Sequence, residues 1–221
     1  MSKVDAIIPA YNESKTIGGV IKVLKASEHI GKVVVISDGS TDNTEEVAKQ
    51  AGADLVHQLP VKKGKGAAMM HGVTHTDSNV IAFFDADLKG LTPDHVELIV
   101  LPVLTGARMM NVGLRDRGYF GTAMMHHLPL IGGERAMMRH VFEDIPDQFM
   151  QGFMVEAALN YYCRSHGYAY GGVKLPGLKI VKKYQKVGWP KAIGEYASMS
   201  WVVYQAMIKV RFAHLRGKFW K

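Results

Sequence analysis

Short apolar runs and amphipathic repeats alternate along the first half of the chain. Segments with the length and apolar content of β-strands lie at 4–8, 32–36, 54–57, 80–84 and 108–114. The intervening segments carry the apolar spacing or start signals of helices at 14–26, from 42 onward, at 66–75 and at 92–104. Because strands that alternate with helices pair in parallel, this order predicts an α/β fold with a mostly parallel, Rossmann-like sheet flanked by helices.

The alternation stops near residue 115. Beyond it, the pattern predicts helices at 134–142 and 153–166, a strand at 168–175 and a long helix at 192–218. We therefore divide the chain into a first half (1–114), a second half of the same domain (115–191) and a C-terminal helix (192–221).

The C-terminal helix is predicted to be amphipathic and basic. Lys209, Arg211, Arg216 and Lys218 flank an apolar stripe made of Trp201, Ile208, Phe212, Leu215 and Phe219. An apolar stripe edged with long cations is typical of a helix lying at a membrane surface. Packing on the protein core with a solvated basic rim is the open alternative.

Composition limits the class of protein without deciding it. The 221 residues are 48% apolar, which suits a folded domain, and carry a net charge of +7 that suits a polyanionic partner or an anionic membrane. The single cysteine excludes an internal disulfide, and neither a secretory leader nor a bilayer-spanning apolar run is seen. We expect a cytoplasmic protein, at the inner face of the cell membrane if the C-terminal helix contacts lipid.

Polar, acidic or glycine-rich segments follow the predicted strands. They are Pro9-Ala10-Tyr11-Asn12-Glu13, Asp38-Gly39-Ser40-Thr41-Asp42, Lys63-Gly64-Lys65-Gly66 and Asp85-Ala86-Asp87. Parallel α/β sheets bind their ligands at the carboxyl edge, where these segments would meet. Together they indicate one pocket for a nucleoside diphosphate and a metal ion.

Each residue of this predicted pocket has both a possible ligand-binding role and a possible role in local structure. Asp85 and Asp87 are hard oxygen ligands suited to Mg²⁺ or Mn²⁺ shared with substrate phosphates, although a solvated turn would look the same. Asp38 can accept a hydrogen bond from a nucleotide base or cap a turn. Lys65 and Gly66 begin a helix, where free N–H groups and a lysine favour an anion; the loop lacks Walker A spacing.

In this order the segments resemble those of the family-2 glycosyltransferases of the GT-A fold. Dolichyl-phosphate-mannose and polyprenyl-phosphate sugar synthases belong to that group. The resemblance implies an inverting, metal-dependent hexosyltransferase with a sugar-nucleotide-binding first half and an acceptor-binding second half. It implies contacts to the base, ribose and diphosphate of a UDP- or GDP-sugar from Pro9, Ala10, Tyr11, Glu13, Asp38, Lys65 and Gly66, and Asp87 as the main metal ligand with help from Asp85.

Weaker resemblances follow later in the chain. They lie in Gly132-Gly133-Glu134-Arg135-Ala136, Gly152-Phe153-Met154-Val155-Glu156 and Lys186-Val187-Gly188-Trp189-Pro190-Lys191. They imply phosphate contacts from Arg135, Lys186 and Lys191, and make Glu156 our candidate general base toward an acceptor hydroxyl. Glu156 could equally complement a helix dipole, and a polyprenyl-phosphate acceptor would need no base. Residues 182–186 contain no histidine, whereas many relatives use a histidine in this loop as a further metal ligand.

Two other classes remain open. A sugar-nucleotide nucleotidyltransferase shares the architecture, but the first strand would then be followed by a glycine-rich loop. A non-catalytic basic module that binds nucleotides or membranes would explain the charge. The Asp85 and Asp87 pair disfavours a polyanion at that edge, so we expect no nucleic-acid partner; a homodimer is compatible with the sequence.

Overall fold

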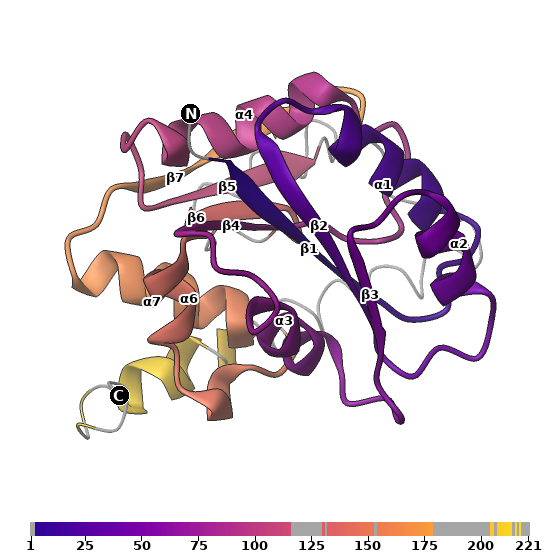
Figure 1. Cartoon of the computed structure of the whole chain (residues 1–221). Coiled ribbons are helices and arrows are strands. Elements are labelled where there is room, and N and C mark those ends of the chain that lie inside the picture. Colours follow the sequence, from indigo (N-terminus) through magenta and orange to yellow (C-terminus); the bar gives the residue numbers. More distant parts are fainter. Residues whose placement is uncertain are drawn as a thin grey trace, which may run out of the picture.

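The chain forms a seven-stranded sheet with the order β3-β2-β1-β4-β6-β5-β7 (Figure 1). This computed structural model describes residues 3–115, 130, 132–152, 154–178, 204, 205, 207–213, 215 and 217. The strands are β1 (Val4–Ala10), β2 (Ile30–Ser37), β3 (Leu55–Gln58), β4 (Val80–Phe83), β5 (Met110–Arg115), β6 (Arg135–Met138) and β7 (Tyr170–Leu175). The helices are α1 (Ile17–Ala26), α2 (Thr44–Gln50), α3 (Lys65–Val73), α4 (Pro93–Leu104), α6 (Arg139–Glu143), the 3₁₀ turn η2 (Asp147–Phe149) and α7 (Met154–Ser165).

Helices cover both faces of the sheet, as Figure 1 shows, with α1, α2 and α4 on one face and α3, α6 and α7 on the other. Successive residues of a strand point to opposite faces, so Ala6 and Ile8 of β1 join the first apolar layer while Ile7 joins the second. Burial on both faces explains why the strands read as continuous apolar runs. The predicted α/β fold with a mostly parallel sheet is confirmed.

The helix predicted at 134–142 is wrong in its first half. Residues Arg135–Met138 form β6, which pairs antiparallel with both β4 and β5, and only Arg139–Glu143 is helical. Alanine and methionine favour helices, which is why the segment looked helical. Hydrogen bonding and burial between two strands outweigh that local preference.

The C-terminal helix is described only in part. The described residues between 204 and 215 are helical, and Val210 is buried while Ile208, Phe212 and Leu215 of the predicted apolar stripe are exposed. Gly217 is described and forms a turn, whereas the rest of the predicted helix, like Lys186 and Lys191, lies outside the described residues. Within the described part of the chain, no helix has the length and hydropathy needed to cross a bilayer.

Candidate functional site

The first two polar segments are tied into one rim at the carboxyl edge of the sheet. Asn12 N donates to Ser40 Oγ at 3.1 Å, and Asn12 Oδ1 accepts from Thr41 N at 2.8 Å. Glu13 N donates to Thr44 Oγ1 at 2.8 Å. Asn12 adopts a left-handed backbone with φ of 55°, which asparagine tolerates better than most residues. The turn after β1 is therefore held in place by the loop that leads into α2.

Asp38 fastens a third segment to this rim. Its side chain is buried, and its two oxygens accept from Lys63 N at 2.7 Å and from Gly64 N at 2.8 Å. A Cβ on Gly39 would lie 2.7 Å from Lys62 N, so glycine permits the close approach of the two loops. In this arrangement the carboxylate holds the loop before α3; its expected contact with a base stays a prediction.

Tyr11 presents an aromatic ring beside this loop. Its side chain is 38% exposed, and the ammonium of Lys62 lies 3.7 Å from the ring centroid. Pro9 and Ala10, at the end of β1, are buried. Of these three residues, Tyr11 is the one whose side chain can form a wall against a ligand, and the other two can contribute only backbone contacts.

Asp85 lies between two cations at the same edge. Lys65 Nζ is 2.5 Å from Asp85 Oδ1, and Arg115 Nη2 is 2.5 Å from Asp85 Oδ2. The guanidinium of Arg115 also forms a two-pronged contact with Glu134, in which Nε to Oε2 is 2.8 Å. A Cβ on Gly133 would lie 2.0 Å from Asp85 Oδ2, so the chain before β6 packs directly against this carboxylate.

Strand direction explains why these residues meet. Asp85 follows β4 and Arg115 ends β5, while Glu134 precedes β6, which runs antiparallel to both. The ends of β4 and β5 and the start of β6 therefore share one edge of the sheet. Lys65 reaches the same edge because α3 begins there.

Charge pairing decides the ionisation of this cluster. Burial alone would raise the pKa of Asp85, but Lys65 and Arg115 hold it below its usual value. Burial raises the pKa of Glu134 despite Arg115, and the pKa of Arg115 is raised by the two carboxylates that counter its own desolvation. The cluster keeps an ionised Asp85 under two positive charges.

Asp87 and Glu13 give the site an excess of negative charge. The pKa of Glu13 is raised by burial and then by the charges of Asp87, Asp42 and Asp85. Asp87 is partly buried, and no ion pair to it is found among the residues that the structure describes. Carboxylate oxygens are the ligands that Mg²⁺ and Mn²⁺ prefer. The donor type of Asp87 and Asp85 therefore suits such an ion, although both oxygens of Asp85 are paired with Lys65 and Arg115.

Arg135 and Glu156 bring buried polar atoms close enough to Asp85 and Lys65 for their charges to interact. Arg135 is fully buried, and its Nη2 donates to Gly132 O at 2.5 Å. Arg135 Nη1 and Glu156 Oε2 are both buried, and neither has a hydrogen-bond partner among the residues that the structure describes. The negative charges of Glu156 and Asp85 act on both Arg135 and Lys65. Buried polar groups without partners are costly, and they commonly mark a place where a ligand binds.

Gly66 allows α3 to begin against this side of the site. A Cβ there would lie 1.8 Å from Met150 O, just beyond η2. Among the predicted site residues that the structure describes, Lys65 contacts Asp85 directly, and the charges of Glu156 and Arg135 act on Lys65. The roles expected of these residues stay predictions. The joint role of Arg115 and Glu134 could not be recognised from the sequence, because a charge pair 19 residues apart leaves no local pattern.

Comparison with known proteins assigns the family. The sequence matches the family described as Glycosyl transferase family 2 over residues 5–161, and the chain belongs to that family. The family-2 resemblance predicted from the motifs is thereby confirmed.

Individual relatives extend the comparison. The chain is 29% identical to a glucosyl-3-phosphoglycerate synthase of Mycolicibacterium smegmatis over 71% of its own length and 62% of that protein. It is 41% identical to a Staphylococcus aureus 4,4'-diaponeurosporenoate glycosyltransferase over 42% of its length and 26% of that protein. The chain thus spans less than two thirds of these curated relatives.

A solved structure shows the same fold. Mycobacterium tuberculosis glucosyl-3-phosphoglycerate synthase, in complex with Mn²⁺, UDP and phosphoglyceric acid, is 25% identical with a TM-score of 0.74. The match covers 94% of this chain and 78% of that one. The GT-A architecture expected from the motifs is confirmed, and the bound Mn²⁺ of this neighbour agrees with the expected class of cofactor.

Proposed function

We propose that this chain transfers a sugar from a nucleoside-diphosphate sugar to an acceptor, with UDP-sugars as the first donors to test. The observation that carries the proposal is the Asp85 cluster, where Lys65 and Arg115 meet one carboxylate two residues before Asp87. Family membership and the UDP and Mn²⁺ held by the solved neighbour support it.

Asp87, together with Asp85, would hold Mn²⁺ or Mg²⁺. Such an ion supplies a Lewis acid that offsets the negative charge developing on the departing diphosphate. Burial, and then the charges of Asp87, Asp42 and Asp85, raise the pKa of Glu13; a cation held by Asp85 and Asp87 would relieve that repulsion.

Lys65 and Arg115 are positioned to bind the diphosphate of the donor. The side chain of Lys65 is 41% exposed while its ammonium touches Asp85, so it can reach a ligand at the rim. Its helix, α3, also directs free N–H groups toward this edge. In this proposal the Tyr11 ring stacks on the base, Pro9 and Ala10 contribute backbone contacts, and Glu13 and Asp38 complete the nucleoside pocket.

The acceptor would bind on the side of Arg135 and Glu156. The partnerless Glu156 Oε2 can take the proton of an acceptor hydroxyl as that hydroxyl attacks the sugar, and direct displacement inverts the anomeric centre. The partnerless Arg135 Nη1 can bind an anionic group of the acceptor. Lys186 and Lys191 remain proposed phosphate contacts.

A lipid-phosphate acceptor remains an alternative to a soluble hydroxyl acceptor. The exposed Ile208, Phe212 and Leu215 support peripheral contact of the C-terminal helix with a membrane. Co-sedimentation with anionic vesicles, compared with neutral vesicles, tests this. Binding to neither kind would remove the membrane contact and favour a soluble acceptor.

The donor assignment is tested by following UDP or GDP release from a panel of sugar nucleotides, with Mn²⁺ or Mg²⁺ and then with EDTA. We expect release from one nucleotide series that EDTA abolishes. Asp87→Asn should remove turnover while the melting temperature is kept, whereas Asp77→Asn, at an exposed position outside the site, should behave as the parent does. Full turnover in Asp87→Asn would contradict the proposal. Formation of a nucleoside triphosphate and a sugar 1-phosphate when pyrophosphate is added to the sugar nucleotide would indicate a nucleotidyltransferase instead.

A further inference from the structure

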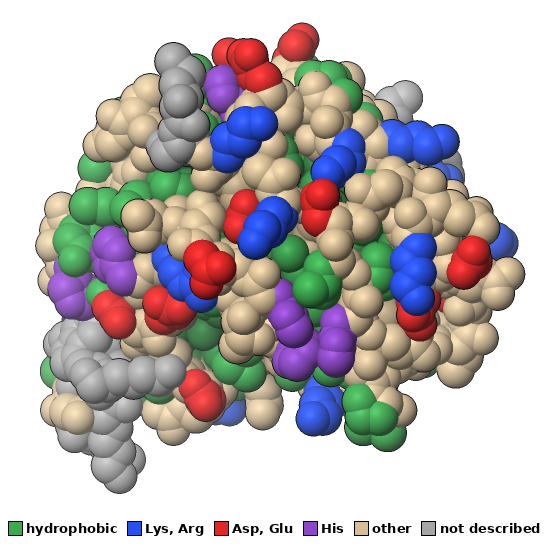
Figure 2. Space-filling view, in the orientation of Figure 1, with side chains coloured by type: hydrophobic (Ala, Val, Ile, Leu, Met, Phe, Trp, Pro, Cys, Tyr) green, Lys and Arg blue, Asp and Glu red, His purple; other side chains and the backbone are tan. Residues whose placement is uncertain are grey.

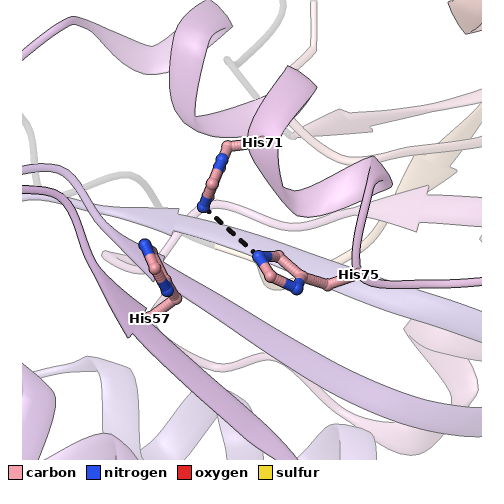
Figure 3. Close-up of side chains that lie close together, drawn as sticks. All are labelled: His57, His71 and His75. Carbon is pink, nitrogen blue, oxygen red and sulfur yellow. Dashed lines mark hydrogen bonds between the residues drawn. The ribbon is translucent and has the colours of Figure 1, made fainter.

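Three histidines converge on the face formed by β3 and α3. His57 lies in β3, His71 lies in α3, and His75 follows the end of that helix (Figure 3). One ring nitrogen from each lies within 4.8 Å of those of the other two. Histidine side chains gather on the molecular surface over α3 and β3 (Figure 2). In the described part of the chain, no other group of three or more His, Cys, Asp or Glu side chains brings its possible ligand atoms this close together.

The local fold explains the convergence. Residues 71 and 75 are one helical turn apart, so they share a face of the segment that begins with α3. Helix α3 packs on the sheet next to β2, and His57 stands opposite Ile36 of β2 in the neighbouring edge strand. All three residues are partly exposed, so an ion can reach them from solvent.

The spacing of the nitrogens suits a shared metal ion. His71 Nε2 and His75 Nε2 are 3.2 Å apart. Two nitrogens at about 2.0–2.1 Å from one tetrahedral Zn²⁺ are roughly 3.3 Å from each other. The ring centroids of His57 and His71 lie 4.5 Å apart, so the third imidazole can join them by a side-chain rotation.

The chemistry of the three groups indicates which ions they would bind. Imidazole nitrogen is a preferred ligand of Zn²⁺, Cu²⁺, Ni²⁺ and Co²⁺, whereas Mg²⁺ prefers oxygen. Burial, followed by the neighbouring His57, His75 and Lys63, lowers the pKa of His71, which favours the neutral ring that can ligate a metal. The site would thus differ in metal preference from the carboxylates of Asp85 and Asp87.

We propose that His57, His71 and His75 form a second metal site, which takes one Zn²⁺ or a similar borderline transition-metal ion with water as the remaining ligand. A metal bound there joins β3 to α3 across the loop at 59–64. That loop supplies the Lys63 and Gly64 amides to Asp38 and leads into Lys65. The bound ion would therefore hold the loop and the start of α3 in place.

The test is calorimetric titration of the full chain with ZnCl₂ after treatment with EDTA and removal of the chelator. We expect one tight equivalent in the parent protein. His75→Gln and His57→Gln should each weaken it at least 10-fold, whereas His166→Gln, at an exposed histidine outside the cluster, and Asp87→Asn should retain it. Unchanged binding in both cluster variants, or no tight equivalent in the parent, would overturn the site.

Co²⁺ gives a second readout that does not depend on catalysis. A four-coordinate histidine site should produce the intense visible absorption of tetrahedral Co²⁺, and one equivalent of Zn²⁺ should remove it. Circular dichroism of each variant separates loss of a ligand from loss of fold. If the absorption is the same in His57→Gln and His75→Gln as in the parent, Co²⁺ is bound elsewhere and the proposal fails.

Discussion

Lys65 Nζ lies 2.5 Å from Asp85 Oδ1, although the two residues are 20 positions apart in the sequence. Lys65 is the first residue of α3, whereas Asp85 follows β4. Arg115 holds the second oxygen of the same carboxylate at 2.5 Å. Because Arg115 also pairs with Glu134, the two cations are shared between two carboxylates. In the proposed function, the phosphates of the donor compete with Asp85 for Lys65 and Arg115.

Lys65→Gln should separate nucleotide binding from metal binding. We expect the affinity for UDP to fall roughly 10- to 100-fold, since a hydrogen bond to a charged group contributes about 1.5–3 kcal/mol. The affinity for Mn²⁺ alone should hold or rise, because a competing cation is gone from Asp85. Calorimetry measures both, with Lys49→Gln, an exposed helix-surface variant, as the control. Unchanged UDP affinity would remove Lys65 from the donor site.

Arg115→Met should destabilise the fold, because Glu134 is fully buried and Arg115 supplies its counter-charge. Removing one partner of a buried pair costs about 3–5 kcal/mol. The variant Glu134→Gln should cost less, since glutamine carries no charge. In the double variant we expect a coupling energy of about 1–3 kcal/mol. Urea unfolding of the parent, the two single variants and the double variant measures this coupling energy. Additive effects would show that the two side chains do not stabilise each other.

The sequence predicted the strand ends well and the strand partners less well. Apolar runs followed by the segments at Tyr11, Asp38 and Asp85 placed these residues at one sheet edge, because every parallel strand directs its carboxyl end there. No such rule located β6, whose antiparallel direction depends on contacts with β4 and β5. The Arg115–Glu134 pair was missed for the same reason, since it forms only once β5 and β6 lie in register.

Asp38 shows a different limit of sequence reasoning. Its position after β2 allowed both a base contact and a turn cap, and the structure shows both oxygens bound to backbone amides of the loop before α3. A local pattern identifies a carboxylate at a strand end. It does not identify the hydrogen-bond donors of that carboxylate, because here the two donating amides lie 25 and 26 residues further along the chain.

Gly66→Ala should be destabilising where Gly19→Ala is stabilising. A methyl group on Gly66 would lie 1.8 Å from Met150 O, so the loop after η2 must move, at a cost of about 1–3 kcal/mol. Gly19 is inside α1 with no atom within 4 Å of an added Cβ, so alanine there should gain about 0.5–1 kcal/mol. Melting temperatures should therefore shift in opposite directions; a neutral Gly66→Ala would contradict the close contact with Met150.

Asp42 should contribute to stability at neutral pH and lose that contribution in acid. Its desolvation would raise the pKa, but hydrogen bonds from Thr44 and Ser14 lower it to about 2, against about 3.9 in an unfolded chain. Because the pKa of Asp42 is lower in the folded than in the unfolded chain, its ionised carboxylate stabilises the fold above about pH 4. This stabilisation is lost as the pH falls from about 4 toward 2.

Because Asp42 is exposed, we expect solvent screening to leave at most about 1 kcal/mol of this contribution. Asp42→Asn should therefore be less stable than the parent at pH 7, and the difference should shrink as the pH approaches 2, where about half of the parent carboxylates are protonated. Urea unfolding across that range measures the two curves, with Asp77→Asn as the exposed control. Parallel curves for the parent and Asp42→Asn would show that the hydrogen bonds from Thr44 and Ser14 do not favour the ionised form.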